Sequence, residues 1–457
     1  MSFSYNIFGL KNKLAILWVR NGVLSLALAG LYSIVLVILK NPPIKSLIPN
    51  SEIYKTAFVV QANLSGQIWL LSITAIIWCQ NFKFHFWGVI CSRLALFGII
   101  MIGCSPFFGQ DLPVMSHYIP MLENIVFILG LSLFGTTMLL FAINVIYGYV
   151  FSKANIYKAP HDVLIGFAAI SSAAIFIVVW FCFALSYAQL HGVIKLVPVD
   201  IEFYYELLYW SGGHMLYFLY TQILLIVWVL LFQIWVAKNL HFYKFYLFAL
   251  SLNFLLVLGG FAGHFFYDIV DGEFMEYYTI YIKYFGGIVP IVSLLLLLVD
   301  VFKDKKLKSL LVKHTIACSG LLFLLGGLIG VHIIDMNITI PAEYPSSIIG
   351  ISIAFMGIVY VICDSEFSYN QTGGPIQNRF QTWQIYIIFF GQILNIGGLA
   401  CAGIYEVFKK NVITECGLVV KIAAGLIEAG ELIAIIGSLM FVFICGKRLC
   451  SLSLRGN

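Results

Sequence analysis

Titratable side chains interrupt the long apolar stretches of this 457-residue sequence at only a few positions. Glu206 and His214 lie in one such stretch, His264 in a second, and Glu428 and Glu431 three residues apart in a third. A neutral imidazole is a common metal ligand, and two carboxylates on one helix face suit a proton relay. Ionisable groups inside a membrane mark pathways or cofactor sites by default, so these residues are candidates for function, and Glu428 with Glu431 would suit a proton relay or an ion site.

His214 directly follows two glycines, Gly212 and Gly213, in a stretch that begins near Phe203. A helix rises 1.5 Å per residue, so His214 is predicted about 16 Å from that start, near the middle of a membrane. The glycines have no side chains, which leaves room for a large planar group or for a neighbouring helix. The sequence predicts a functional histidine here, with a hydrogen-bonded core residue as the alternative.

The elements that must position these residues are membrane helices. Hydrophobic residues make up 61% of the chain and charged residues only 10%, whereas soluble proteins average about 45–50% and about 25%. This composition excludes a soluble enzyme. About 20 apolar residues form a helix that crosses a bilayer. Twelve stretches meet this requirement, at about 18–39, 57–79, 85–107, 121–150, 163–189, 203–237, 245–267, 279–302, 309–334, 342–363, 384–405 and 418–446.

Lysine and arginine concentrate on one side of the predicted membrane, with four of them in one loop, at Lys303, Lys305, Lys306 and Lys308. Acidic residues crowd a loop on the other side that has no Lys or Arg: Asp268, Asp271, Glu273 and Glu276. Because basic loops are retained in the cytoplasm, both termini are predicted to be cytoplasmic. This bias explains the net charge of +5 without a nucleic-acid partner. The short connections predict a single integral membrane domain over residues 1–457.

Three segments resemble the catalytic subunit I of the haem-copper oxidase superfamily, which includes nitric oxide reductases. The run YELLYWSGGHMLYFLYTQ at 205–222 is similar to a helix-six segment whose histidine binds copper. VVQANLSGQIWLLS at 59–72 is similar to the helix-two segment that begins with a haem-ligating histidine. IPAEYPSSIIGISIAFMG at 340–357 is similar to the helix-ten segment that usually reads H-x-H. The resemblance implies an all-α bundle of twelve transmembrane helices of the subunit I type.

The resemblance also implies a function. It is that of a terminal respiratory oxidase in the bacterial inner membrane, which passes electrons to dioxygen or nitric oxide and couples this to proton uptake. Haem and copper would be its cofactors, and an electron donor and other respiratory subunits its partners besides the lipid bilayer. His214 and His264 would be the copper ligands, and Glu206, Glu428 and Glu431 are the candidates for the proton path.

Several family positions carry other residues in this sequence. Gln61, Glu343 and Pro345 occupy the places of the axial haem ligands, where imidazole is the usual donor. Proline has no side-chain donor atom, so a haem between helices two and ten is not expected. The first alternative is a non-catalytic homologue kept for assembly. The second is a secondary transporter, supported by the pair Glu428 and Glu431.

Overall fold

The structure of the chain is a computed structural model that describes residues 13–40, 51–79, 85–109, 112–151, 160–195, 198–236, 242–303, 310–332, 340–369, 379–411 and 417–455. Within these residues, 12 helical spans are long and apolar enough to cross a membrane. The prediction of an all-α, multi-pass membrane protein is confirmed. The haem-copper oxidase type stays a prediction.

Each predicted stretch corresponds to one of the 12 observed spans, with ends that differ by several residues, and two of these differences have a local structural cause. Residue 121, the predicted start of one helix, lies instead in the short strand β2 (Met121–Leu122), and α7 (Ile125–Val150) begins later. Asn124 caps α7, since its side-chain oxygen accepts hydrogen bonds from the backbone N–H groups of Val126 and Phe127. The helix predicted from 279 begins earlier, as α12 (Gly272–Tyr281), with Glu273 in its first turn.

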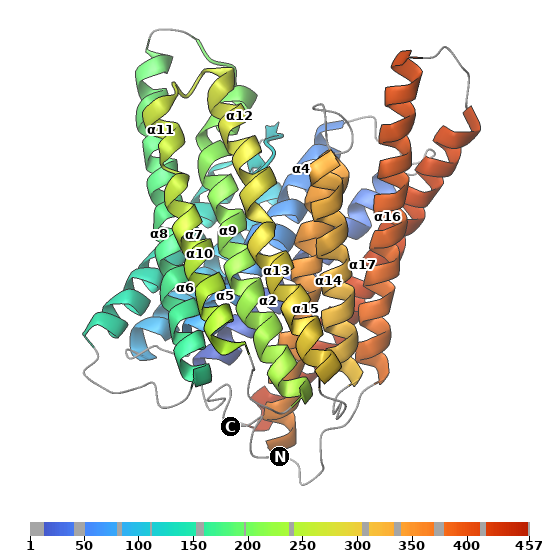
Figure 1. Cartoon of the computed structure of the whole chain (residues 1–457). Helices are drawn as coiled ribbons and strands as arrows, with labels where there is room; N and C mark the ends of the chain where they lie inside the picture. Colours follow the sequence, from blue (N-terminus) through green and yellow to red (C-terminus); the bar gives the residue numbers. More distant parts are fainter. Residues whose placement is uncertain are drawn as a thin grey trace. The chain divides into compact units, whose positions relative to one another are not determined.

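The chain divides into two compact units, Met1–Ile226 with Leu240–Ser293, and Val227–Asn239 with Leu294–Asn457. Unit 1 contains most of the helices (Figure 1). In addition to α7 and α12 they are α2 (Lys13–Lys40), α4 (Ser51–Asn63), α5 (Trp69–Trp78), α6 (His85–Cys104), α8 (Pro160–Ile194), α10 (Tyr243–Gly259) and α11 (Ala262–Phe266). Helices α9 (Ile201–Val236) and α13 (Ile288–Lys303) begin in unit 1 and end in unit 2. The prediction of a single domain stays a prediction.

Large aromatic side chains fill the core of unit 1. Trp18 of α2 stacks on Phe141 of α7 with ring centroids 5.4 Å apart, and Trp78 of α5 packs edge-on against the same Phe141. Trp78 also donates a hydrogen bond from Nε1 to Ser172 Oγ of α8. The most apolar window of α9 is 94% buried, the largest buried share among the described spans. Polar side chains on α9 therefore face protein rather than lipid.

Two turns of π-helix interrupt the helices of unit 1, and both adjoin polar or glycine positions. The first, η1 (Leu64–Ile68), joins α4 to α5, and the second, η4 (Ile282–Gly286), joins α12 to α13. Such wide turns are frequent at functional sites because they reorient the side chains that follow. η1 contains Gln67 and η4 contains Lys283.

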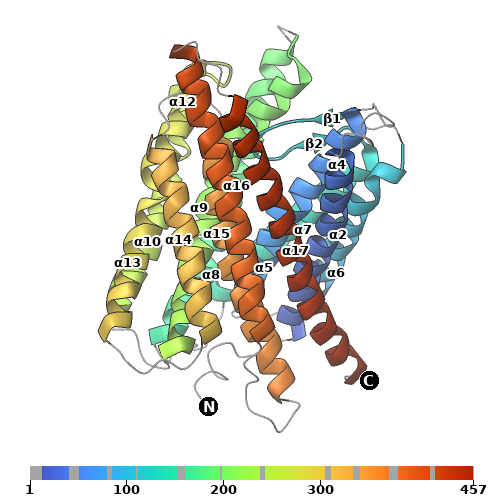
Figure 2. The same ribbon diagram turned by 90° about the vertical axis from the view of Figure 1, so that its right-hand side faces the viewer.

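A short hairpin covers one end of α4 in unit 1. It consists of β1 (Pro113–Val114) and β2, which pair in antiparallel fashion beside α4 (Figure 2). Their connection includes His117 and Tyr118. The hairpin thus brings a loop residue close to the helices, as described below.

Unit 2 contains α14 (Leu310–His332), α15 (Ile340–Tyr369), α16 (Arg379–Asn411) and α17 (Gly417–Arg455). Glycines allow the backbones of α16 and α17 to approach closely: a Cβ atom on Gly430 would lie 2.5 Å from Asn395 N and 2.6 Å from Gly391 O. Further along α17, toward its C-terminal end, Arg448 forms an ion pair with Asp364 of α15. Gln381 of α16 donates a hydrogen bond to the same carboxylate at 3.1 Å.

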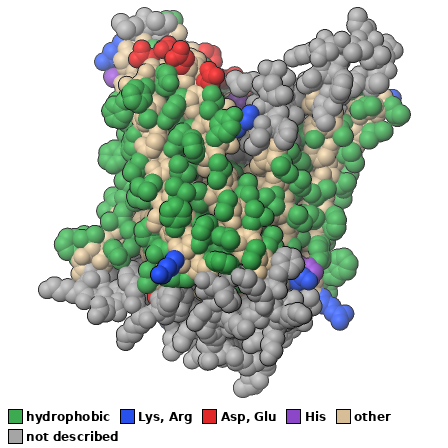
Figure 3. Space-filling view, in the orientation of Figure 1, with side chains coloured by type: hydrophobic (Ala, Val, Ile, Leu, Met, Phe, Trp, Pro, Cys, Tyr) green, Lys and Arg blue, Asp and Glu red, His purple; other side chains and the backbone are tan. Residues whose placement is uncertain are grey.

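The described surface is largely hydrophobic, as expected for helices in a bilayer (Figure 3). Acidic side chains gather at the end of unit 1 where α11 and α12 meet. They are the exposed residues Asp268, Asp271, Glu273 and Glu276.

Candidate functional site: a buried histidine region in unit 1

His214 of α9 is 2% exposed and uses both of its ring nitrogens. Nδ1 lies 2.7 Å from the backbone oxygen of Trp210, and Nε2 lies 2.9 Å from the hydroxyl of Tyr118. A carbonyl oxygen only accepts, so Nδ1 carries the proton. Nε2 of the neutral ring then accepts a hydrogen bond from Tyr118. These contacts are those of a hydrogen-bonded core histidine, which was the alternative that the sequence left open.

Tyr118 reaches His214 from the β1–β2 hairpin and is held there by Gln67. The amide of Gln67 donates to the backbone oxygen of Tyr118 at 3.1 Å and accepts from the hydroxyl of Tyr220 at 2.5 Å. Gln67 lies in η1, where the widened turn orients its side chain toward α9. A residue of the π-helical turn therefore anchors the backbone of Tyr118, whose hydroxyl bonds to His214.

His264 of α11 is also buried and also uses both ring nitrogens. Its Nδ1 lies 2.9 Å from Gln189 Oε1, and its Nε2 lies 2.9 Å from Ser211 Oγ. The amide oxygen only accepts, so Nδ1 carries the proton and Ser211 donates to Nε2. Ser186 then lies 3.2 Å from Ser211 and can donate to it in turn. Both nitrogens of the imidazole are therefore hydrogen-bonded to protein groups.

The two imidazoles share one neighbour, the buried ring of Tyr278. The ring centroid of Tyr278 lies 5.7 Å from that of His214 and 6.1 Å from that of His264. The Tyr278 hydroxyl donates to the backbone oxygen of Gly260 at 2.5 Å. The fold thus brings His214 and His264 into one region, and copper binding by the pair stays a prediction.

The space beside His214 is filled by aromatic rings. A Cβ atom on Gly212 would overlap the ring of Phe183, and one on Gly213 would overlap Tyr118. The sequence suggested that these glycines leave room either for a planar group or for a neighbouring helix. At Gly212 the space is taken by a neighbouring helix, because Phe183 belongs to α8. Room for a large planar group is not found at either glycine.

Glu206 lies one turn before Trp210 and binds His117 rather than His214. Glu206 Oε1 lies 2.5 Å from His117 Nδ1, and Glu206 Oε2 accepts the backbone N–H of His117 at 2.9 Å. This hydrogen bond raises the pKa of His117, because the carboxylate favours the charged imidazolium, while partial burial opposes the shift. The ring of Trp210 lies between the two histidines, with centroids 6.0 Å from His117 and 5.0 Å from His214.

The predicted haem-ligand positions are not brought to His214 by any described contact. Gln61 is half-buried and donates a hydrogen bond to Ser65 Oγ, one turn along, at 3.3 Å. Glu343 and Pro345 lie in α15, but their side chains are outside the described part of the structure.

Glu428 and Glu431 lie on α17, which belongs to unit 2, whereas the histidine region belongs to unit 1. Glu428 is exposed and makes no hydrogen bond or ion pair with the residues that the structure describes, and Glu431 is half-buried. Both residues lie within the helix α17, so their separation of three residues places them on one face of it. A proton path through them stays a prediction.

Several partners in this region were not among the sequence candidates: Tyr118, Gln67, Gln189, Ser211 and Tyr278. Gln67 and Ser211 lie within two of the three family-like segments, which is the signal that could have identified them. The other three come from distant parts of the chain and have no local pattern. Over the described residues, no group of three or more His, Cys, Asp or Glu side chains could hold a metal ion.

Two relatives resemble the chain over most of its length. A protein of Rickettsia prowazekii (strain Madrid E), described as the uncharacterized protein RP382, is 40% identical over 95% of this chain and 96% of its own length. An uncharacterized protein of Aquifex aeolicus (strain VF5) is 25% identical over 82% of this chain and 90% of its own length. No protein-family profile matches the sequence. The chain belongs to the same protein family as RP382 of Rickettsia prowazekii.

Proposed function

We propose that this chain is a membrane subunit of the haem-copper oxidase type that holds no haem-copper centre and acts as a structural subunit of a respiratory complex. The observation that carries the proposal is the histidine region of unit 1. All four ring nitrogens of His214 and His264 are hydrogen-bonded to protein groups. The two candidate ligands are thus engaged in packing the bundle.

The residues present do not fit a haem beside His214. The ring of Phe183 and the ring of Tyr118 occupy the positions next to Gly212 and Gly213. A planar macrocycle would have to displace both rings, and with Tyr118 the hydrogen bond to His214. Gln61, at the helix-two ligand position, donates to its own helix instead.

The residues also do not fit the copper site of the oxidases, which uses three imidazoles. Unit 1 offers His214 and His264, and each Nε2 accepts a hydrogen bond from a hydroxyl, Tyr118 or Ser211. Metal binding would break both hydrogen bonds and still leave the site one imidazole short. We therefore derive no electron transfer through these histidines.

The exposed carboxylate of Glu428 supports a role in assembly. It lies about 17 Å along α17 from Gly417, well inside the span. A carboxylate facing lipid at such a depth costs about 2.5–3.5 kcal/mol, so charged groups in membranes normally face protein. The partner that fits is a membrane helix of another subunit with a Lys or Arg at that depth. A second copy fits poorly, because a twofold axis along the membrane normal would place Glu428 against Glu428.

We further propose the bacterial inner membrane as the location, with both termini in the cytoplasm. The support is the distribution of Lys and Arg among the loops together with the 12 helical spans. Labelling of single cysteines introduced at Lys305 and Asp271 by a membrane-impermeant reagent tests the orientation. Labelling at 271 but not at 305 in intact cells is expected, and the reverse would contradict it.

The absence of a haem-copper centre is tested on the full chain purified from its native membrane. We expect no stoichiometric haem in a reduced-minus-oxidised spectrum and no stoichiometric copper by elemental analysis, alongside a haem-copper oxidase prepared in the same way. A Soret band that is lost in His214→Ala but kept in His191→Ala, an exposed histidine of α8, would overturn the proposal.

Assembly is tested by native electrophoresis after mild solubilisation. Glu428→Lys is expected to shift the chain from a complex to the size of the single subunit, while Glu202→Gln, at an exposed acid outside the apolar core of α9, leaves the complex intact. An unchanged complex in Glu428→Lys would contradict the proposed interface. A disulfide between two copies of Glu428→Cys would show a homodimer instead.

A further inference from the structure

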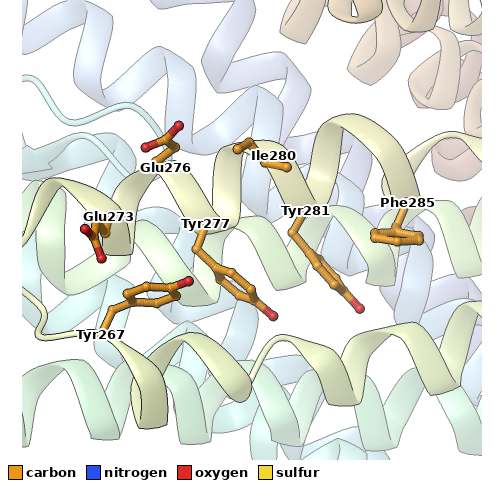
Figure 4. Close-up of a pocket in the computed structure, with 7 residues that line it drawn as sticks. All are labelled: Tyr267, Glu273, Glu276, Tyr277, Ile280, Tyr281 and Phe285. Carbon is orange, nitrogen blue, oxygen red and sulfur yellow. The ribbon is translucent and has the colours of Figure 1, made fainter.

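A cavity of about 450 Å³ lies on α12 at the acidic end of unit 1 (Figure 4). Its lining combines two carboxylates, three tyrosine rings and two apolar side chains: Tyr267, Glu273, Glu276, Tyr277, Ile280, Tyr281 and Phe285. The histidine region does not use any of these residues. The cavity therefore needs an explanation of its own.

The lining has its carboxylates at one end, where Tyr267 lies beside Glu273, and Ile280 lies between Tyr277 and Tyr281 along the helix (Figure 4). Glu273 and Glu276 come first, Tyr277 and Tyr281 follow, and Phe285 lies at the far end (Figure 4). Tyrosine is typical of the membrane–water interface, where one end of the ring is wet and the other apolar. The order predicts a cavity that begins at the headgroup level and continues toward the acyl chains.

Two of the three tyrosine hydroxyls, those of Tyr277 and Tyr281, are bonded to the backbone of α10 and therefore do not point to a ligand. Tyr277 donates to Gly259 O at 2.8 Å, and Tyr281 donates to Leu256 O at 2.5 Å. Their rings are nearly parallel, with centroids 5.7 Å apart and planes 24° apart. The tyrosines thus present ring surface to the cavity, and the carboxylates are its hydrogen-bond acceptors.

This combination suits a primary ammonium group. An ammonium has three N–H donors and no acceptor, which matches carboxylate oxygens, and it is attracted to aromatic ring faces. The surrounding loop carries Asp268 and Asp271 in addition, and it contains no Lys or Arg. The local field therefore favours a cation over an anion.

A basic residue lies further along the helix than the two carboxylates. Lys283, in η4, follows Glu276 by two turns, about 10 Å along the axis. It is half-buried, and its flexible side chain can extend toward the interface. The acids outside and the lysine inside reproduce the charge order of a zwitterionic phospholipid, whose ammonium lies further out than its phosphate.

We propose that this cavity binds the headgroup of an ethanolamine phospholipid. Glu273 and Glu276 accept hydrogen bonds from the ammonium, Lys283 binds the phosphate, and an acyl chain lies along Ile280 and Phe285. These two side chains are 46% and 41% exposed, so the groove for the chain is open to lipid. Exposed Tyr284 and Ile288 continue the same apolar surface.

The test measures lipid binding to the full-length, detergent-purified chain by native mass spectrometry. Phosphatidylethanolamine, phosphatidylcholine and phosphatidylglycerol with identical acyl chains are the probes. We expect phosphatidylethanolamine to bind about tenfold more tightly than phosphatidylglycerol, the size of effect that one or two charge-assisted hydrogen bonds produce. Equal binding of phosphatidylcholine, which has no N–H donor, would overturn the ethanolamine assignment.

The variant that tests the site is Glu273→Gln/Glu276→Gln, which should reduce phosphatidylethanolamine affinity about tenfold and leave phosphatidylglycerol unchanged. Asp268→Asn/Asp271→Asn is the matched control, because it removes the same charge from the same loop at residues that do not line this cavity. Equal losses in both variants would mean a general field effect and overturn the proposal. Circular dichroism confirms that both variants are folded.

A free amine and a lipid share the ammonium chemistry, so soluble phosphoethanolamine is added as a competitor. If the acyl chain contributes as proposed, millimolar phosphoethanolamine does not displace the lipid. Displacement at that concentration would identify a soluble ligand and contradict the lipid proposal. Lys283→Gln should weaken all three phospholipids alike, because it removes the phosphate contact; an unchanged affinity would overturn the role of Lys283.

Discussion

Gly213→Ala tests whether the space beside His214 is filled by Tyr118. The added methyl group would lie 2.6 Å from Tyr118 Cβ, closer than real Cβ contacts. The ring must move, which costs about 1–3 kcal/mol for overpacking, and its hydrogen bond to His214 Nε2 is lost at about 1 kcal/mol. Alanine regains about 1 kcal/mol of helix propensity. The net destabilisation is therefore about 1–3 kcal/mol.

The free energy of unfolding is measured by titrating the purified chain with a denaturing detergent in mixed micelles and following helical circular dichroism. Gly192→Ala in α8 is the matched control, because a Cβ there would meet nothing within 4 Å. The control should be neutral or stabilised by up to about 1 kcal/mol. If Gly213→Ala is as stable as Gly192→Ala, Tyr118 does not fill this space, and the argument against a planar group beside His214 fails.

Three further predictions concern charged groups. Glu206 raises the pKa of His117 in the folded protein. The pair therefore stabilises the fold fully below the ordinary imidazole pKa of about 6.5, and the stabilisation is lost as the pH rises through the raised pKa of folded His117. His117 is 66% exposed, so the loss is below about 1 kcal/mol; detergent titrations at pH 6 and 9 should show it in the wild type and not in Glu206→Gln. Arg448→Met should destabilise the chain by about 2–3 kcal/mol, since it leaves the partly buried carboxylate of Asp364 without its cation. Asp364→Leu/Arg448→Met should recover part of that loss in the same titration, and an equal or larger loss would refute the explanation. Glu428→Leu should stabilise the isolated chain by about 2 kcal/mol in the titration, because it removes a carboxylate from lipid, and a destabilised variant would show an internal partner.

The spans could be predicted closely because hydrocarbon thickness sets a length that composition must satisfy. The boundary at residue 121 was wrong because a short hairpin strand, Met121–Leu122, has the same apolar composition as a helix end. The start at 279 was late because the first turns of α12 are acidic and lie outside the most apolar window. In both cases the hydrophobic composition of the segment does not show where the helix begins.

The histidine region was predicted in part. The depth of His214 and His264 follows from counting residues along helices, and the structure brings both to Tyr278. Their hydrogen-bond partners could not be predicted in the same way, because Tyr118 comes from a hairpin and Gln189 from another helix. Gln67, which was not a candidate from the sequence, reaches this region from the π-helical turn, whereas Gln61 bonds to Ser65 one turn along its own helix.

The sequence by itself determined that this is a multi-pass membrane protein, because 61% hydrophobic residues in stretches of membrane length allow little else, and the described residues contain 12 such spans. It also determined which few polar residues lie within those helices. Only the tertiary structure decided what they do there. Whether a buried imidazole is open to a metal or engaged with a hydroxyl depends on side chains from distant segments, and at His214 and His264 those side chains are Tyr118 and Ser211.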